Sequence, residues 1–450
     1  MNKGKDSLSS EAITRLHGVA IVVGDKSVSH RALILSAIAE GSTTINGLLH
    51  SADVHATLNA LRDLGVKINI LENGDVEVIG VGMHGLCQPK SQLDLGNAGT
   101  GVRLLMGLVG SQQISATFTG DESLSSRPMR RITEPLSQMG IQVSDDGRGL
   151  LPVTITGRSS PLPLSYNSPV ASAQIKSAIL LAGLNARGKT TVTEPAKSRD
   201  HTERMLAHFG VVVNTTTNTD GTYSAGVDGG AILQSNDIIV PRDPSSAAFL
   251  IVAALITQNS KITLPTIGMS PERIGLITTL QEMGGNIEVL NRREVGGEEV
   301  ADITVSSSNL NGIDVPANRA PSMIDEYPIL CVAAACASGS TLMQNIGELR
   351  HKEADRIATM AKGLMLAGVS VDETETSMCV HGTRAANNTH PIKGGFSISS
   401  EHDHRIAMSF LTLGCVSSDK IIVHGVSTIE TSFPGFVNMM NSLGAKISSI

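Results

Sequence analysis

The octapeptide LRDLGVKI, residues 61–68, contains a pattern that returns five times further along the chain. Each copy has a Leu or Met, two further residues, a small or apolar residue, and then a Gly followed by alternating positions. The other copies are LSQMGIQV, LAHFGVVV, LQEMGGNI, LMLAGVSV and MNSLGAKI, and the glycines are Gly65, Gly140, Gly210, Gly284, Gly368 and Gly444. Because these glycines are 70 to 84 residues apart, the sequence indicates six copies of one structural unit.

The residues around each copy predict that every unit contains a helix and a strand followed by a second helix and a second strand. HRALILSAIAEG, residues 30–41, is typical of a buried helix, and STTINGLL, residues 42–49, alternates like a half-exposed strand. The octapeptide then predicts the end of a second helix, closed by its glycine in the left-handed conformation, and a following strand. Similar segments surround the other copies.

Six copies predict two similar domains in an α/β (α+β) protein, because one unit is too small for a robust core and three make an ordinary domain. The segment NDIIVPRDPSS, residues 236–246, lies where the third copy ends and the fourth begins. We expect one domain over residues 25–240 and the other over residues 1–24 and 241–450. Since a cleft between similar lobes is a common ligand site, we expect the active site in the inter-domain cleft.

Composition and charge exclude several classes of partner. The 450 residues carry a net charge of -7, whereas a nucleic-acid-binding domain normally shows a basic patch or stripe. The five cysteines are odd in number and form no CxxC pair, which is typical of reduced thiols. Residues 1–15 show no signal-peptide pattern, and no apolar run approaches the ~20 residues that span a bilayer. We therefore expect a cytoplasmic protein with neither nucleic acid nor membrane as a partner.

Several of the apolar helices begin with cations, hydroxyls or glycines. GDKSVSHRAL, residues 24–33, places a lysine, a histidine and an arginine at one helix start, and GNAGTGVR, SAQIK and EHDHR open three others. Helix N-termini favour anions, and added Lys or Arg strengthens a phosphate or carboxylate site. One such start alone is more often a simple cap, as we interpret Ser245 and Ser246, but the repetition favours anion binding.

Three further charged clusters, SSRPMRR, SRDHTER and ELRHKEADR, precede predicted helices. Such clusters are most often solvated first turns. Asp325 differs, because it opens a very apolar helix, where a carboxylate can act as an acid or base. HExxH, Cys/His quartets, EF-hand loops and GxSxG are absent from the sequence. We therefore expect no metal and no cofactor, and a reaction of anions driven by positioning and electrostatics.

Together these motifs resemble the family of 5-enolpyruvylshikimate-3-phosphate synthases (3-phosphoshikimate 1-carboxyvinyltransferases). The segments GDKSVSHRA, LGNAGTGVR, GDESLSSRPM, SAQIKSAILLAGL, SMIDEYP, LRHKEADR and DHRIAMSF occur in the family's order over nearly the whole chain. SAQIKSAILLAGLNARGKTTVTEP with SRDHTE is similar to the second bacterial sub-group. The resemblance implies two domains of three βαβαββ units each, which agrees with the count of repeats.

The resemblance also implies a reaction and its binding residues. The family transfers the enolpyruvyl group of phosphoenolpyruvate to the 5-hydroxyl of shikimate 3-phosphate and releases inorganic phosphate, on the path to chorismate and the aromatic amino acids. Residues implied to bind shikimate 3-phosphate are Lys26, Ser27, Arg31, Ser172, Ala173, Gln174, Arg199, Asp325 and Lys352. Residues implied to bind phosphoenolpyruvate are Lys26, Gly99, Arg127, Gln174, Arg356 and Arg405.

Three of these residues have implied catalytic roles. Asp325 would take the proton of the 5-hydroxyl, and Lys352 would help to place the substrate beside it. Glu353, with Lys26, would handle the proton on the methylene carbon. Addition at C2 gives a tetrahedral ketal phosphate, and loss of phosphate leaves the enolpyruvyl ether. The expected enzyme is a monomer whose domains close over both substrates.

Two positions bear on how this chain differs from other members. Many members carry a lysine before a Phe-Pro pair near the C-terminus, where this chain has Thr431 and Ser432. The second sub-group shares this difference, so we expect activity to remain. Gly99 leaves room where some glyphosate-tolerant members have alanine, and this predicts sensitivity to glyphosate.

Two other functions stay open at this point. A UDP-N-acetylglucosamine enolpyruvyl transferase shares the fold and the chemistry, but GDKSVSHR and DEYP fit that family poorly. A non-catalytic anion-binding protein on the same scaffold would be expected to lack Asp325, Glu353 or Lys26, and this chain has all three.

Overall fold

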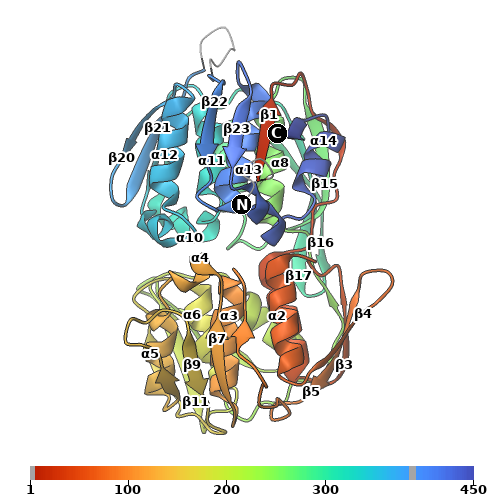
Figure 1. The fold of residues 1–450 in the computed structure, drawn as a ribbon, viewed down its shortest axis with the longest axis vertical. Helices are drawn as coiled ribbons and strands as arrows, with labels where there is room; N and C mark the ends of the chain where they lie inside the picture. Colours follow the sequence, from red (N-terminus) through yellow and green to blue (C-terminus); the bar gives the residue numbers. More distant parts are fainter. Residues whose placement is uncertain (1–5, 385–391) are drawn as a thin grey trace. The chain divides into compact units, whose positions relative to one another are not determined.

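The computed structural model describes residues 6–384 and 392–450, and the chain divides into two compact units (Figure 1). Unit 1 comprises the described residues of Met1–Val23, Arg242–Glu294 and Glu299–Ile450, and unit 2 comprises Gly24–Pro241 and Val295–Glu298. The described part of each unit contains three four-stranded sheets together with helices that cover them.

The three sheets of unit 2 share one pairing pattern. Their strand orders are β14-β3-β5-β4, β6-β7-β9-β8 and β10-β11-β13-β12. In each sheet the first pair is parallel and the other two pairs are antiparallel. The strands are β3 (Glu40–Asn46), β4 (Lys67–Ile70), β5 (Val76–Val81), β6 (Leu93–Asp94), β7 (Ser115–Thr119), β8 (Gln142–Ser144), β9 (Val153–Thr156), β10 (Ser165–Asn167), β11 (Lys189–Glu194), β12 (Val213–Thr217), β13 (Tyr223–Asp228) and β14 (Ile238–Ile239). The helices are α1 (Lys26–Ile38), α2 (Ala52–Asp63), α3 (Gly99–Gly110), α4 (Glu122–Ser125), α5 (Arg130–Gln138), α6 (Ala173–Gly183) and α7 (His201–His208).

Unit 1 repeats this order in the sheets β2-β15-β17-β16, β18-β19-β21-β20 and β22-β23-β1-β24. In the third sheet, β1 from the start of the chain lies between β23 and β24, and it is antiparallel to both. The strands are β1 (Ser7–Glu11), β2 (His17–Val19), β15 (Lys261–Gly268), β16 (Asn286–Val295), β17 (Glu298–Ser306), β18 (Asp314–Val315), β19 (Ser340–Gln344), β20 (Ser370–Glu373), β21 (Ser377–His381), β22 (Phe396–Ser399), β23 (Ile421–His424) and β24 (Lys446–Ser449). The α-helices are α8 (Pro244–Ile256), α9 (Gly275–Glu282), α10 (Ala320–Met323), α11 (Tyr327–Ala335), α12 (Arg356–Leu366), α13 (His404–Leu413) and α14 (Phe436–Ser442). Short 3-10 helices are η1 (Ala317–Arg319), η2 (Gly347–His351), η3 (Gly414–Val416) and η4 (Val426–Thr431).

The repeated glycine ends the second helix of every copy. All six glycines have a positive φ, between +75° and +114°, which glycine adopts without the steric cost of a Cβ. The residue after each glycine donates its N–H to the carbonyl five residues earlier, as in a Schellman motif. The acceptors are the first residues of the six octapeptides, Leu61, Leu136, Leu206, Leu280, Leu364 and Met440. The predicted left-handed helix end is confirmed in all six copies.

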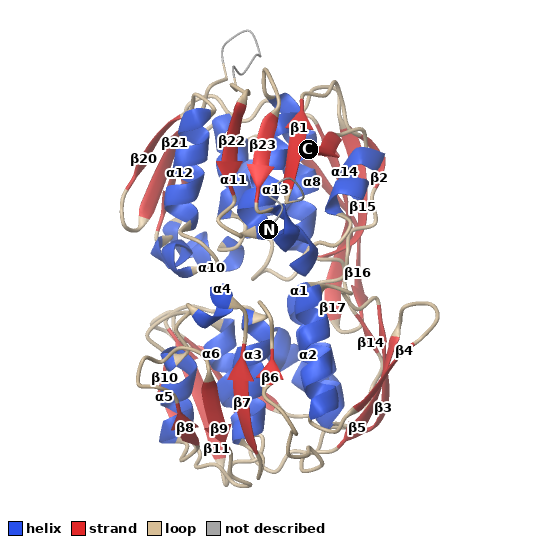
Figure 2. Ribbon diagram, viewed as in Figure 1, coloured by secondary structure: helices blue, strands red, loops and turns tan. Residues whose placement is uncertain are grey.

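The first helix of each copy is largely buried and covers its own sheet (Figure 2). In unit 2, α1 packs on β3 and β5, α3 on β7 and β9, and α6 on β11 and β13. In unit 1, every residue of α8 and of α11 is buried, and these helices pack against each other and against α13. A helix that is apolar on all sides belongs in a core, where each large aliphatic side chain stabilises the fold by about 1.5–3 kcal/mol. This packing fixes where the helices begin.

The tip of the β16–β17 hairpin, residues 295–298, packs with unit 2, whereas the sequence placed it with residues 241–450. A Cβ on Gly296 would lie 2.7 Å from the backbone oxygen of Ile239, so glycine permits this close approach. The Glu298 carboxylate lies 3.0 Å from Nδ1 of the buried His201. Neither contact follows from the hairpin's local sequence, because both partners come from a distant part of the chain.

Candidate active site

The start of α1 holds the first group of predicted residues. Asp25 is the N-cap, and its carboxylate accepts the N–H of Val28 at 2.9 Å. Lys26 is the first helical residue, and its ammonium forms an ion pair with Asp53, a buried residue in the first turn of α2. The N-terminus of α1 therefore brings backbone N–H groups and an ammonium together, and this arrangement favours the binding of an anion.

Arg31 lies one turn further along α1 and is buried. Its guanidinium donates to the carbonyl oxygen of Ser27 at 3.0 Å, to the hydroxyl of Thr202 at 2.6 Å and to the hydroxyl of Ser177 at 2.9 Å. These hydroxyls belong to α7 and α6, so Arg31 joins the start of α1 to both helices. These three acceptors are neutral groups, and they hold the planar guanidinium in a fixed orientation.

His30 supports this helix start from within the core. It is completely buried, and its Nδ1 lies 2.8 Å from the hydroxyl of Thr57 in α2. Burial, together with the nearby charges of Lys26 and Arg31, lowers the pKa of His30 well below 6.5, so the imidazole is neutral. Asp25 thus caps the start of α1, and the neutral His30 braces it against α2.

The start of α3 gathers three residues that were predicted to bind phosphoenolpyruvate. α3 begins at Gly99, where a Cβ would lie 3.0 Å from a terminal nitrogen of Arg103 and 3.1 Å from one of Arg127. Arg127 is buried and donates to the side-chain oxygen of Asn97 at 2.6 Å. Arg103 donates to the side-chain oxygen of Gln174 at 3.0 Å. Gly99, Arg127 and Gln174 thus lie together. Arg103, which joins them, was not predicted as a site residue.

The start of α6 contains the predicted residues Ser172 and Ala173. Ser172 is the N-cap, and its own backbone N–H donates to the Glu194 carboxylate at 2.6 Å. Ala173 is the first helical residue, and Gln174 follows it. Arg199 is partly buried in the loop between β11 and α7. Through Arg31, the structure connects this helix start with that of α1.

In unit 1, Arg356 is the centre of the predicted residues. It is the first residue of α12 and only 2% exposed. Its guanidinium donates to Asp403 at 2.7 Å and to Glu353 at 2.6 Å, and it lies 3.4 Å from Asp325. Burial alone would lower the pKa of Arg356, but the three carboxylates outweigh this effect and raise it. Arg356 therefore keeps its charge and holds two predicted catalytic carboxylates next to each other.

Asp325 lies in the turn between α10 and α11, two residues before α11 begins, and not at the first position of the helix as the sequence suggested. Its carboxylate is 3.9 Å from the ammonium of Lys352 and 4.0 Å from the guanidinium of Arg405. Arg405 also lies 3.5 Å from the buried Glu326. With Arg356, three cations surround Asp325. Unit 1 thus brings together Asp325, Lys352, Glu353, Arg356 and Arg405.

Two carboxylates that support these residues were not predicted as site residues. Asp403 is fully buried and caps α13, where it accepts the N–H of Arg405 at 2.8 Å while it also binds Arg356. Asp53 pairs with Lys26. The sequence signals for both are those of ordinary helix starts, and their cationic partners lie far away along the chain. Pattern alone could not distinguish them from simple caps.

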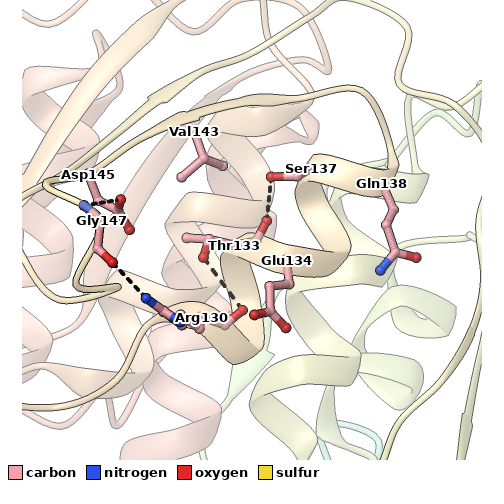
Figure 3. A pocket seen from close by; sticks show the side chains of 8 residues that line it. All are labelled: Arg130, Thr133, Glu134, Ser137, Gln138, Val143, Asp145 and Gly147. Atoms are coloured by element: carbon pink, nitrogen blue, oxygen red, sulfur yellow. Dashed lines mark hydrogen bonds between the residues drawn. The ribbon is translucent and has the colours of Figure 1, made fainter.

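A surface pocket on α5 contains none of the predicted residues (Figure 3). It is lined by Arg130, Thr133, Glu134, Ser137, Gln138, Val143, Asp145 and Gly147. Arg130 donates to the carbonyl oxygen of Gly147 at 2.6 Å, and the Ser137 hydroxyl donates to the carbonyl oxygen of Thr133 at 2.9 Å. Several of its polar groups thus satisfy one another within the pocket wall, so it is a poor candidate for the reaction.

Over residues 6–384 and 392–450, no three His, Cys, Asp or Glu side chains gather so that they could hold a metal ion. The carboxylates around Arg356 instead face arginine and lysine. Within the same residues, no helix has both the length and the apolar character needed to cross a membrane.

Comparisons with known proteins agree over nearly the whole chain. A family model described as EPSP synthase (3-phosphoshikimate 1-carboxyvinyltransferase) matches residues 10–440. The 3-phosphoshikimate 1-carboxyvinyltransferase of Paramagnetospirillum magneticum is 51% identical, and the match covers 98% of each chain. That of Rhodospirillum rubrum is 49% identical, again over 98% of each chain. A solved structure of EPSP synthase from Acinetobacter baumannii superposes with a TM-score of 0.86 at 45% identity, over 98% of this chain and 100% of the other.

Proposed function

This chain belongs to the EPSP synthase (3-phosphoshikimate 1-carboxyvinyltransferase) family, and from that premise we propose which of its residues carry the reaction. The chain is a transferase that moves the enolpyruvyl group of phosphoenolpyruvate to the 5-hydroxyl of shikimate 3-phosphate and releases inorganic phosphate. The product leads to chorismate and the aromatic amino acids. The observation that carries our assignment is the position of Asp325 among Lys352, Arg356 and Arg405, next to Glu353.

Unit 2 supplies most of the groups that we assign to shikimate 3-phosphate, and Asp325 and Lys352 of unit 1 complete the set. Lys26, Ser27 and Arg31 start α1, and Ser172, Ala173 and Gln174 start α6, which Arg31 contacts through Ser177. Backbone N–H groups and cations at helix starts are the donors that a phosphate prefers. Arg199, in the loop before α7, is the further cation that we assign to the phosphate group.

Unit 1 supplies the two carboxylates that we assign to proton transfer. Asp325 accepts the proton of the 5-hydroxyl as this oxygen bonds to C2 of phosphoenolpyruvate. Glu353, aided by Lys26, delivers a proton to the methylene carbon, and this addition yields the tetrahedral ketal phosphate. In the second step the new methyl group returns a proton to the Glu353 carboxylate while the C–O bond to phosphate breaks, and the departing phosphate takes the proton held by Asp325. Positioned acids and bases of this kind contribute typically about 10²–10⁴-fold to a rate.

Phosphoenolpyruvate carries a phosphate and a carboxylate, and we assign it to cations in both units. Lys26, Arg127 and Gln174 lie in unit 2, where Gly99 leaves space beside Arg127. Arg356 and Arg405 lie in unit 1. Arg405 has only long contacts with the carboxylates of Asp325 and Glu326, at 4.0 and 3.5 Å, so its guanidinium can turn to an incoming anion without loss of a short hydrogen bond to them.

Three finer points also remain proposals. We propose that the enzyme is a monomer in the cytoplasm, that it needs neither metal nor cofactor, and that it belongs to the second bacterial sub-group. Light scattering on the protein as it elutes from a size-exclusion column tests whether it is a monomer. Activity assays after treatment with a chelator test whether it needs a metal. A stable dimer, or activity that returns only with a divalent cation, would contradict the corresponding point.

The function is tested by phosphate release from phosphoenolpyruvate in the presence of shikimate 3-phosphate, with mass spectrometry of the enolpyruvyl product. UDP-N-acetylglucosamine serves as the competing acceptor. We expect turnover with shikimate 3-phosphate and none with the nucleotide sugar. The reverse result would assign the chain to the related transferase, and binding of both substrates without any phosphate release would leave only an anion-binding protein.

A further inference from the structure

Lys176 is a fully buried lysine that the proposed reaction does not use. Its ammonium lies 3.0 Å from Glu194, 2.9 Å from Glu203 and 3.3 Å from the carbonyl oxygen of Ser198. The ring centroid of Tyr223 lies 5.0 Å away, within the range of a cation–π interaction. A buried ion is costly even when it is paired, and an apolar side chain of similar volume could fill this space without that cost. Packing alone therefore does not explain the cluster.

Glu194 connects Lys176 to two segments of the candidate site. One carboxylate oxygen accepts the backbone N–H of Ser172 at 2.6 Å, and both oxygens accept the hydroxyl of Ser198, at 2.8 and 2.7 Å. Ser172 is the N-cap of α6, and Ser198 directly precedes Arg199. One buried carboxylate thus fixes both a helix start and a loop that we assign to shikimate 3-phosphate.

The charges in the cluster support a permanent ion pair. Burial alone would lower the pKa of Lys176, but Glu203 and Glu194 outweigh this effect and raise it. Burial raises the pKa of Glu203, and the nearby Lys176 offsets this only in part. Lys176 consequently stays positive near neutral pH, and it contacts the Glu194 oxygen that does not accept the N–H of Ser172.

We propose that Lys176 and Glu194 are positioning residues for shikimate 3-phosphate, which hold the start of α6 and the loop before Arg199 in their binding geometry before the substrate arrives. This inference rests on the proposed function. Because a preorganised site loses less conformational freedom on binding, disruption of the cluster should weaken the binding of shikimate 3-phosphate more than it slows the chemical step. Most residues assigned to phosphoenolpyruvate lie outside the cluster, so its KM should change less.

Glu194→Gln is the first test, and Glu203→Gln is its matched control. Glutamine at 194 keeps the size but turns an N–H donor or a neutral oxygen towards Lys176, and it weakens the bonds to Ser172 and Ser198. Glu203→Gln makes the same chemical change on the other side of Lys176. We expect Glu194→Gln to raise the KM and the Kd for shikimate 3-phosphate about tenfold or more, since it removes charge-assisted hydrogen bonds. Glu203→Gln should stay within about threefold of the wild type.

A second variant and a second measurement cover the case in which Glu194→Gln folds poorly. Ser198→Ala removes the hydroxyl between Glu194 and the loop but leaves the ion pair intact, and it should raise the same KM about threefold. Hydrogen exchange of the substrate-free protein should be faster at residues 172–176 and 196–200 in Glu194→Gln than in Glu203→Gln. A merely structural role would loosen both variants alike and would change the KM values of both substrates together.

The outcomes separate this inference from the function. A wild-type protein without turnover of shikimate 3-phosphate overturns the function itself. If the wild type turns over, an unchanged KM for shikimate 3-phosphate in Glu194→Gln and Ser198→Ala overturns the positioning role and leaves the function intact. A loss of kcat with an unchanged KM also overturns it, because the cluster would then act on the chemical step.

Discussion

At the scale of single residues, Asp325 gives the sharpest prediction. Asp325→Asn removes the proton acceptor but keeps the size of the side chain next to Lys352, Arg356 and Arg405. We expect the Kd for shikimate 3-phosphate to stay within about threefold and kcat to fall by about 10²–10⁴. Glu348→Gln is a suitable control. The Glu348 carboxylate also contacts Lys352, at 2.9 Å, but we assign no proton transfer to it. Full activity in Asp325→Asn would remove Asp325 from its role.

Gly99 gives a second prediction at this scale. In Gly99→Ala the new methyl group would lie 3.0 Å from Arg103 and 3.1 Å from Arg127, at the flexible ends of both side chains. These ends can shift by a few tenths of an ångström, so phosphoenolpyruvate should lose only a few-fold in KM, whereas the longer glyphosate should lose about tenfold or more in inhibition. Inhibition assays of the wild type and the variant test this, with the KM for shikimate 3-phosphate as the internal control. A glyphosate-tolerant wild type would contradict the prediction.

At the scale of elements, the glycines that end the second helices differ in their surroundings. A Cβ on Gly210 meets nothing within 4 Å, so Gly210→Ala tests the backbone conformation alone, at a φ of +85°. We expect the free energy of unfolding to fall by about 1–2 kcal/mol, and by less in Gly210→Asn, because asparagine tolerates this conformation better. Gly65→Ala should cost more, since its Cβ would also lie 3.1 Å from the Cys87 sulfur. Urea unfolding ranks the three variants, and equal losses would contradict the argument.

The same glycines show why the repeats could be predicted from the sequence. A Schellman motif requires a residue with positive φ at one fixed position, here Gly65. It also places an apolar residue, here Leu61, four positions before that glycine, so the motif leaves a local pattern in the sequence. The pairing of distant strands within a sheet leaves no such local signature. The pairing of β1 with both β23 and β24 joins residues more than 400 positions apart, for example Ser7 with His424, and no local pattern indicates it.

At the scale of the whole molecule, the sequence indicated the cations of the site better than the groups that hold them. Lys26, Arg31, Arg356 and Arg405 belong to short motifs at helix starts, where residue type and position together suggest anion binding. Their partners depend on tertiary structure. Asp403 reaches Arg356 across 47 positions, and Thr202 reaches Arg31 across 171. Buried partners of this kind become recognisable only when the fold brings distant segments together.

The stability of the whole chain should fall on acidification, because the fold keeps His30 neutral. Burial, with Lys26 and Arg31 nearby, lowers the pKa of His30 well below 6.5, and Asp25 opposes this only in part. Its Nε2 has no hydrogen-bond partner among the described residues, so a second proton would be buried without an acceptor. Below pH 6.5 the unfolded chain therefore binds a proton that the folded chain does not. The contribution of His30 to the free energy of unfolding is therefore present above that pH and decreases as the pH falls below 6.5.

Urea unfolding of the wild type and of His30→Gln between pH 5 and pH 7.5 tests this linkage, and the exposed His84→Gln is the control. His30→Gln should be less stable at pH 7.5, because it disturbs the contact with Thr57. Its loss of stability between pH 6.5 and pH 5 should nevertheless be smaller than that of the wild type, since glutamine does not titrate. His84→Gln should follow the wild-type pH dependence, because it leaves His30 in place. If His30→Gln keeps the wild-type pH dependence, His30 is not the group that makes the fold sensitive to acid.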